Sequence, residues 1–195
     1  MDGDVGAGAS LREGTVVLVE GVSDRIALET LAARRRLDLD SLGVALTAVG
    51  GAQAVARTLA GLAPGVRVGV LCDAGEEAVV RRALERVGTG SRQDALQWPE
   101  FFVCERDLED ELIHTLGAET VQRLLEKHGD LRAFRTLQRE PEWRGRPVEE
   151  QLRRFLGSGA SRKTRYARIL VEALDLERVP RPLDAVLAYA IGGAP

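Results

Sequence analysis

Short apolar runs alternate with amphipathic segments over the first half of the chain. Four runs have the pattern of buried strands: residues 15–19, 44–49, 66–72 and 101–104. Three segments between them carry apolar residues at helical spacing: residues 23–36, 52–62 and 78–87. Strands and helices in alternation, with short connections, predict parallel strands joined by right-handed crossovers. We therefore expect an α/β fold around a mostly parallel, four-stranded sheet.

The second half of the chain has only helical patterns. They lie at residues 107–116, 119–128, 147–156, 162–174 and 183–190. The first 14 residues are rich in Gly, Asp and Ala, which is typical of a disordered tail. These patterns predict three parts: a disordered tail at 1–14, an α/β core at 15–117 and a helical C-terminal extension at 118–195.

Composition narrows the class of protein. The chain has 195 residues, of which 45% are hydrophobic, enough for one domain with a real core. It has no run of about 18 apolar residues and no signal-peptide pattern, so we expect a cytoplasmic protein without a membrane partner. Aromatic residues make up only 4%, which argues against binding single strands with rows of stacked rings. Cys72 and Cys104 are too few for a disulfide scaffold, and we expect both to be buried.

Charge is unevenly distributed along the chain. The net charge is −3, but residues 131–168 hold 11 basic and 4 acidic side chains. An acidic first part and a basic second part fit a protein that binds metal ions with one half and phosphates with the other. A solvated basic helix face is the simpler alternative, and charge alone does not decide between them.

Acidic residues follow three of the predicted strands. They are Glu20 with Asp24, Asp73 with Glu76 and Glu77, and the cluster from Glu105 to Glu111. Parallel strands end at one edge of a sheet, where open α/β sheets place their ligands. Carboxylates gathered there repel one another unless a cation lies between them, and Mg²⁺ or Mn²⁺ prefers such oxygen ligands. Two such ions can activate water and stabilise the leaving oxygen of a phosphodiester.

Several of these acidic residues also have a purely structural interpretation. Ser23 is a suitable N-cap for the helix at 23–36, and Asp24 could serve only the dipole of that helix. Some acids in the cluster at 105–111 must form the solvent-exposed face of an amphipathic helix. Glu20 and Asp73 have no evident structural role directly after apolar strands, which makes them the strongest candidates for chemistry.

Three basic residues open the predicted helix at 162–174. Arg162, Lys163 and Arg165 stand in its first turn, where the helix dipole disfavours cations. A phosphate bound at this helix end would account for them. The alternative is that the helix boundary is misplaced by a few residues.

The acidic segments, taken in order, resemble a known family. VLVEGVSD at 17–24, VGVLCDAGEE at 68–77 and FFVCERDLEDELI at 101–113 are similar to the motifs of the Toprim fold of topoisomerases, primases and OLD (overcoming lysogenisation defect) nucleases. GASRKTRYA at 159–167 is similar to a late lysine-bearing segment of OLD-family ATP-dependent endonucleases. The resemblance implies a Toprim-like three-layer sandwich and a nuclease active site.

The resemblance also implies roles for individual residues. Glu20 would be a metal ligand or general base, and Asp24 a further metal ligand. Asp73 would be the first aspartate of the Toprim DxD motif. Asp107 and Glu109 would be the acidic pair of the third motif, also binding metal.

The basic segment completes the implied active site. Lys163 would stabilise the transition-state charge on the phosphate, and Arg162 and Arg165 would contact phosphate or DNA. The resemblance therefore predicts a Mg²⁺- or Mn²⁺-dependent DNA endonuclease that hydrolyses phosphodiester bonds.

The chain departs from the family pattern at two points. Gly75 stands where the second aspartate of DxD is expected, and Glu76 or Glu77 would have to replace it. The sequence also lacks G-x-x-x-x-G-K-[ST], so we expect either a stand-alone Toprim protein or one that uses an ATPase partner in trans. The alternative function is a catalytically degenerate Toprim module that binds DNA or a partner ATPase.

Overall fold

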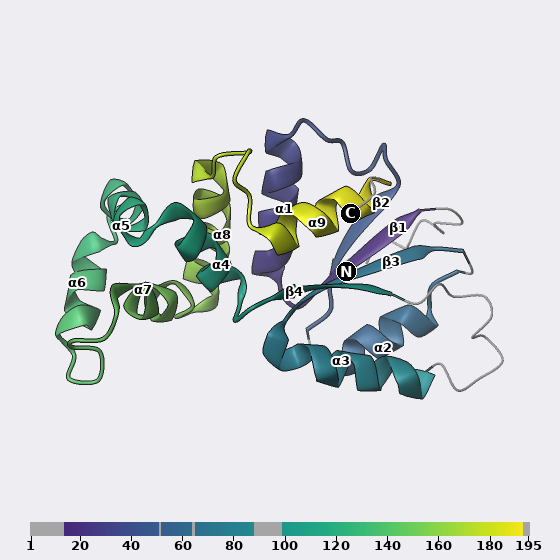
Figure 1. Cartoon of the computed structure of the whole chain (residues 1–195), viewed down its shortest axis with the longest axis horizontal. Helices are drawn as coiled ribbons and strands as arrows, with labels where there is room; N and C mark the ends of the chain where they lie inside the picture. Colours follow the sequence, from purple (N-terminus) through teal and green to yellow (C-terminus); the bar gives the residue numbers. More distant parts are fainter. Residues whose placement is uncertain (1–13, 51, 64, 88–98, 193–195) are drawn as a thin grey trace, which may run out of the picture.

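Four parallel strands form one sheet in the order β2-β1-β3-β4 (Figure 1). The computed structural model describes residues 14–50, 52–63, 65–87 and 99–192. The strands are β1 (Thr15–Val19), β2 (Val44–Ala48), β3 (Arg67–Asp73) and β4 (Glu100–Cys104). The predicted α/β fold with a parallel, four-stranded sheet is confirmed. Apart from its last residue, the predicted tail at 1–14 lies outside the described residues.

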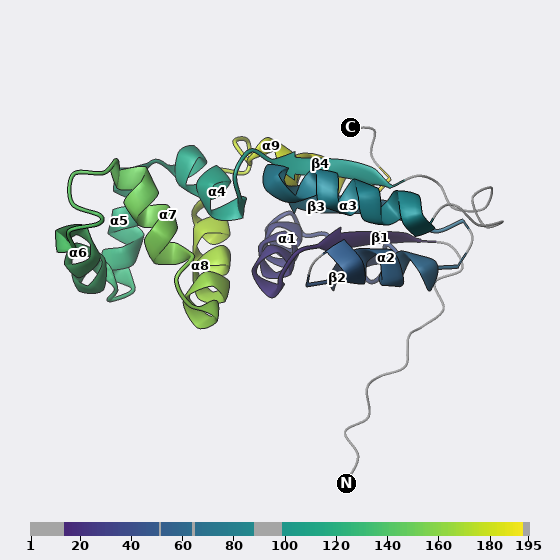
Figure 2. The same cartoon turned by 90° about the horizontal axis from the view of Figure 1, so that it is seen from below.

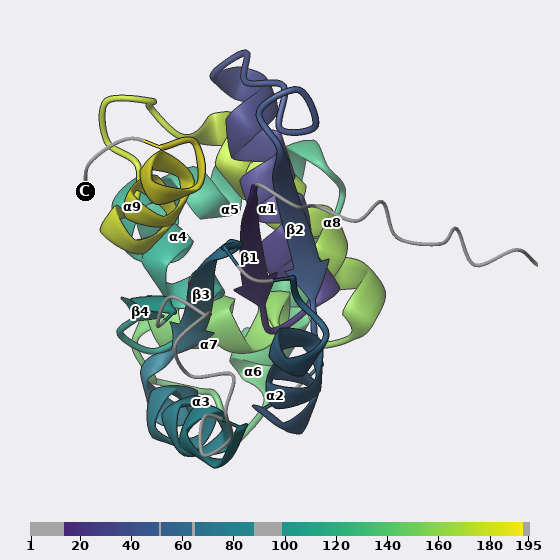
Figure 3. The same ribbon diagram turned by 90° about the vertical axis from the view of Figure 1, so that its right-hand side faces the viewer.

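Helices cover both faces of the sheet (Figure 3). Helices α1 (Val22–Arg34) and α9 (Arg181–Ala190) lie on one face, and α2 (Ala52–Ala60) and α3 (Ala74–Val87) lie on the other. Successive strand residues point to opposite faces, so Val17 and Val19 join one core cluster and Val16 and Leu18 the other. All of β1 is therefore buried, and the predicted three-layer sandwich is confirmed.

The remaining helices form a helical unit beyond the carboxyl ends of the strands (Figures 1 and 2). They are α4 (Leu108–Leu116), α5 (Ala118–Lys127), α6 (Leu131–Arg139), α7 (Val148–Leu156) and α8 (Ala160–Ala173). Arg34 joins this unit to α1, because its guanidinium donates to the carbonyls of Val171 and Leu174 at 2.8 and 2.7 Å. The helical unit thereby stands directly over the edge where the strands end.

Helix α6 was not predicted from the sequence. It is short and rich in arginine, and its apolar residues lie on one narrow face. Phe134 on that face is fully buried, and its ring centroid lies 5.5 Å from that of Phe155 in α7. Leu131, Phe134 and Leu137 lie at helical spacing, so the sequence did carry a signal for this helix, and the packing of the two rings stabilises it.

Helix α9 belongs by sequence to the predicted C-terminal extension, but it is not part of the helical unit. Instead it packs on the sheet, where the Tyr189 ring lies 5.5 Å from that of Phe102 and the Tyr189 hydroxyl donates to the Val68 carbonyl at 3.2 Å. A side chain at Gly69 would place its Cβ 3.2 Å from the same ring. The sheet face that α1 leaves open requires an apolar cover, and the last helix supplies it.

None of the helices in the described parts of the chain is long and apolar enough to cross a membrane.

Candidate active site

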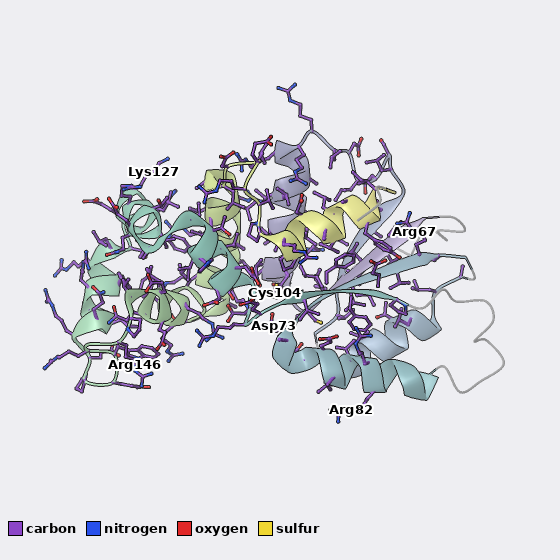
Figure 4. All side chains as sticks on the ribbon, viewed as in Figure 1. Arg67, Asp73, Arg82, Cys104, Lys127 and Arg146 are labelled. Atoms are coloured by element: carbon purple, nitrogen blue, oxygen red, sulfur yellow. The ribbon has the colours of Figure 1, made fainter. Side chains whose placement is uncertain are left out.

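Glu20 and Asp73 lie at the ends of neighbouring strands. Glu20 directly follows β1 and Asp73 ends β3, and these strands pair with Val19 opposite Leu71. Strands β2 and β3 lie on opposite sides of β1, so the direction in which strands are added reverses at β1. The carboxyl end of β1 and β3 is therefore the topological switch point, where open α/β sheets bind their ligands. Figure 4 labels Asp73 at the junction between the sheet and the helical unit.

Asp73 has the most perturbed carboxyl group of the site. Its pKa is raised to about 7, first by burial and then by the carboxylates of Glu20, Asp107 and Asp24, while Lys163 opposes the rise. The contributions of these three carboxylates indicate that negative charges from the other two acidic segments lie near Asp73. The predicted convergence of the three acidic segments is therefore visible in the electrostatics of Asp73.

Asp24 has both a structural and an electrostatic role. Helix α1 begins after Gly21, so the prediction of Ser23 as N-cap was wrong. Asp24 fulfils the capping function, since its carboxylate accepts a hydrogen bond from the Gly21 N–H at 2.8 Å. The side chain is buried, and burial raises its pKa although Lys163 and the Gly21 hydrogen bond oppose the rise.

The third acidic segment divides into inward and outward residues. Asp107 caps α4 by accepting from the Asp110 N–H at 2.8 Å, and it accepts from the Arg153 guanidinium at 2.6 Å. Glu109 is only 6% exposed. Glu111 instead accepts from the backbone N–H of Glu105, which is itself exposed. Asp107 and Glu109 are thus the two acids of this segment that face the site, and Arg153 is a partner that no sequence motif indicated.

Lys163 reaches the carboxylates from α8. Its Nζ lies 3.5 Å from a carboxylate oxygen of Glu109. Burial alone would lower the pKa of Lys163, but Glu109, Asp24, Glu20 and Asp107 together raise it. The ammonium group therefore lies within the field of four acids and stays charged.

Arg162 and Arg165 have other contacts. Helix α8 begins at Ala160, two residues earlier than predicted. Arg162 donates to the Ser158 hydroxyl at 2.6 Å and lies 4.1 Å from the centroid of the Phe155 ring. Arg165 pairs with Asp130 at 2.9 Å and donates to the carbonyl of His128 at 2.8 Å. Both arginines fasten α8 to its neighbours, and their role in phosphate binding stays a prediction.

The position of the missing DxD aspartate has free space around it. Gly75 is exposed in the first turn of α3, and a Cβ added there would meet no atom within 4 Å. Glu77 pairs with Arg81 at 2.8 Å. Burial raises the pKa of Glu20, and Glu76 is the largest of the nearby charges that raise it further. Of the two proposed substitutes, Glu76 is the one that acts on the site.

The donor atoms suit a hard divalent cation, but they are not assembled around one point. Among the residues that the structure describes, no three His, Cys, Asp or Glu side chains are placed to hold a metal ion as they stand. The carboxylate oxygens of Glu20, Asp24 and Asp73 are nevertheless the ligands that Mg²⁺ and Mn²⁺ prefer, and a cation would relieve the repulsion that raises their pKa values. The type of donor atom therefore fits such an ion, and the side chains would have to move closer together to bind it.

The two cysteines beside the site are structural. Both are buried, as expected. Burial raises the pKa of Cys72 to about 12 and also raises the pKa of Cys104 above its ordinary value. Their thiols stay protonated at neutral pH, so neither is a nucleophile.

The crowded carboxylates make the stability of the metal-free protein depend on pH. Asp73 titrates near 3.8 when unfolded and near 7 when folded, so the folded state binds the extra proton between these values. We expect the free energy of unfolding to fall as the pH rises from about 4 to about 7. Asp73→Asn should flatten this slope and stabilise the protein at pH 8 by about 1–2 kcal/mol, less than the full shift implies because the carboxyl is only half-buried.

Urea unfolding in EDTA at pH 4 to 8 measures this effect. Asp40→Asn, which replaces an exposed carboxylate far along the chain from the site, serves as the control and should keep the wild-type slope. An equal slope for wild type and Asp73→Asn would contradict the placement of Asp73 among the other acids.

Comparisons with known proteins support the fold of the chain. Residues 14–74 match the family described as "Overcoming lysogenization defect protein-like, TOPRIM domain". The solved C-terminal region of the Xanthomonas campestris pv. campestris OLD protein is similar, with a TM-score of 0.62 and 22% identity over 92% of this chain and 94% of that one. The corresponding region of the Burkholderia pseudomallei OLD protein has a TM-score of 0.59 and 19% identity, over 91% and 96%. No curated protein matches in sequence. At these identities the solved structures establish a shared fold.

Proposed function

This chain carries an OLD-like Toprim domain, and on that premise we propose that it is a divalent-metal-dependent phosphodiesterase that cleaves DNA. One observation carries the proposal. The carboxyl edge of the sheet collects Glu20 and Asp24 from one motif and Asp73 from another, with Lys163 in their field. The pKa of Asp73, raised to about 7 by burial and by the neighbouring carboxylates, supports the proposal. A group of like charges maintained at such a cost is typical of a functional site.

The acidic residues have different proposed roles in hydrolysis. Glu20, Asp24 and Asp73 would hold Mg²⁺ or Mn²⁺, with Asp107 and Glu109 as the remaining predicted ligands. The bound ion would supply an activated water and stabilise the leaving oxygen. Glu20 has a raised pKa, which suits a group that accepts a proton from water near neutral pH.

Lys163 and Asp107 support this arrangement from the helical unit. Lys163, charged and half-buried, would donate to a non-bridging oxygen of the phosphate as negative charge develops there. Asp107 is held in place by the guanidinium of Arg153. The proposal extends to DNA as the substrate and to a cytoplasmic protein that works alone or with an ATPase in trans.

A second function is favoured by a specific observation. Gly75 replaces the second DxD aspartate, and the described acids do not form a ready three-ligand group. A catalytically degenerate module that binds DNA or a partner ATPase would retain the fold and the acidic edge without hydrolysis. The two functions differ in one measurable respect, which is metal-dependent cleavage.

Cleavage of supercoiled plasmid tests the proposal. We expect nicking by the wild type in Mg²⁺ or Mn²⁺ and none in EDTA. Glu20→Gln should lower the rate by about 100- to 10,000-fold, because it removes both a ligand and the proposed base. Glu172→Gln changes an exposed carboxylate of α8 and should cleave at the wild-type rate.

Two results would overturn the nuclease assignment. The first is cleavage that continues in EDTA or in Glu20→Gln, since the activity would then not depend on this site. The second is a folded wild type that is inactive with both metals, which would establish the binding module instead.

A further inference from the structure

A pocket of about 330 Å³ lies beside the candidate active site, within the helical unit. We call it the arginine pocket, and its members used here are Arg106, Asp107, Trp143, Arg146, Arg153 and Arg154. Its volume is within the range of sites that bind small molecules, about 300–1,000 Å³. Asp107 belongs both to this pocket and to the acidic edge of the sheet, so the two sites are continuous.

The arginine pocket has an excess of positive charge. Four arginines line it, whereas Asp107 and Glu150 are its acidic members. Arg153 pairs with Asp107 at 2.6 Å, and Arg106 lies 3.7 Å from Asp110. The Arg146 Nε–H donates to the Glu142 carbonyl at 2.8 Å, and another guanidinium nitrogen of Arg146 lies 3.9 Å from Glu150. Arg154 is exposed and forms no ion pair within the described parts of the chain. Arg154 is therefore available to an anionic ligand, and Arg146 is available through the guanidinium N–H groups that these contacts leave over.

Hydrogen bonds fix the backbone of Trp143 at the wall of this pocket. The buried amide of Gln151 donates to its carbonyl at 2.8 Å, and its own N–H donates to the Glu140 carbonyl at 3.0 Å. The ring is only half-buried, and the Arg146 and Arg154 guanidinium carbons lie 4.9 and 6.0 Å from its centroid. Figure 4 labels Arg146 on the outer part of the helical unit. Both guanidinium groups lie over this flat ring, so a base that stacks on it takes their place while they turn to bind a phosphate.

We propose that the arginine pocket binds one unpaired nucleotide of the DNA strand on which the active site acts. Arg146 and Arg154 hold its backbone phosphate, and its base stacks on Trp143. This inference rests on the proposed function, because it assumes a nucleic-acid substrate. A single stacking ring is compatible with the low aromatic content, which excludes only rows of such rings.

The location of the pocket gives it a role in substrate choice. The Arg153–Asp107 pair joins its inner end to the acids of the sheet edge. A nucleotide seated there would extend the strand away from the phosphate that is cleaved. The protein should therefore prefer single-stranded DNA, or duplexes with unpaired ends, over blunt duplexes.

Binding measured without metal tests the pocket separately from cleavage. The probe is a fluorescein-labelled dT 20-mer in EDTA, followed by anisotropy. Trp143→Ala should raise the Kd by about 5- to 150-fold, the usual effect of losing one stacked base. The double variant Arg146→Gln/Arg154→Gln should weaken binding and reduce the salt slope by about 1.4, as expected for two phosphate contacts on a single strand.

Matched variants keep the test specific. Arg132→Gln/Arg168→Gln removes two exposed arginines of the helical unit outside the pocket and should leave the salt slope nearer to the wild type. Trp143→Phe should recover most of the affinity that Trp143→Ala loses, which also shows that the turn still folds. An abasic oligomer with the same number of phosphates should bind equally to wild type and Trp143→Ala.

Three results would overturn the inference. They are failure of the wild type to bind the dT 20-mer, an equal effect of Trp143→Ala on the abasic oligomer, and an equal effect of the pocket and control arginine pairs. Pocket-dependent binding without any cleavage would support the inference and reject hydrolysis. Metal-dependent cleavage with no effect of the pocket variants on binding would support hydrolysis and reject the inference about the pocket.

Discussion

Replacing Lys163 by methionine should lower the rate of DNA cleavage by about 100- to 1,000-fold, the usual cost of removing one donor that stabilises transition-state charge. Lys163 is the cation placed among the acids of the sheet edge, with its Nζ 3.5 Å from Glu109. Its removal leaves the phosphate oxygen without this donor and leaves the acids without their compensating charge. Initial rates of plasmid nicking in Mg²⁺ and Mn²⁺ measure the effect.

The stability of the same variant reports the loss of the compensating charge separately from the loss of the phosphate donor. Glu109 is 6% exposed and loses its partner in Lys163→Met, so we expect the free energy of unfolding at pH 7 to fall by about 1–3 kcal/mol. Adding Glu109→Gln should recover this stability, because a neutral amide tolerates burial better than an unpaired carboxylate. Lys127→Met changes an exposed lysine of α5 and should alter neither rate nor stability. Wild-type cleavage by a folded Lys163→Met protein would remove Lys163 from the chemistry.

Restoring the DxD motif with Gly75→Asp should raise the affinity for Mg²⁺ or Mn²⁺ by about tenfold, since affinity follows the number of charged ligands. Position 75 is exposed, and a new Cβ meets no atom within 4 Å, so the side chain enters without a clash. An aspartate also suits the first turn of α3, where the helix dipole favours negative charge. Isothermal titration calorimetry, together with the metal-induced rise in Tm, measures the change.

Ala78→Asp is the matched control for this gain. Ala78 is exposed on the same helix, one turn further on, and an aspartate there adds the same charge outside the motif. Metal affinity that rises equally in both variants would reflect net charge alone. An unchanged affinity in Gly75→Asp would show that Glu76 already fulfils the role of the missing aspartate.

The sequence alone determined the layered core and the strongest candidate residues. A strand has a period of two and a helix a period of 3.6, so both can be recognised in a local stretch of residues. Because parallel strands end at one edge, the alternation of strands and helices is enough to place Glu20 and Asp73 together. The order of the acidic motifs further predicted the Toprim fold that the comparisons support.

The packing of the helices determines which polar side chains meet across the helical unit. Arg153 and Asp107 lie 46 positions apart, and no local pattern distinguishes this arginine from Arg162 or Arg165, whose partners are structural. Helix α9 likewise joined the sheet because an apolar face remained uncovered. Local periodicity fixes the type of an element, whereas long-range pairs depend on how completed elements pack, and a single sequence does not contain that arrangement in any short segment.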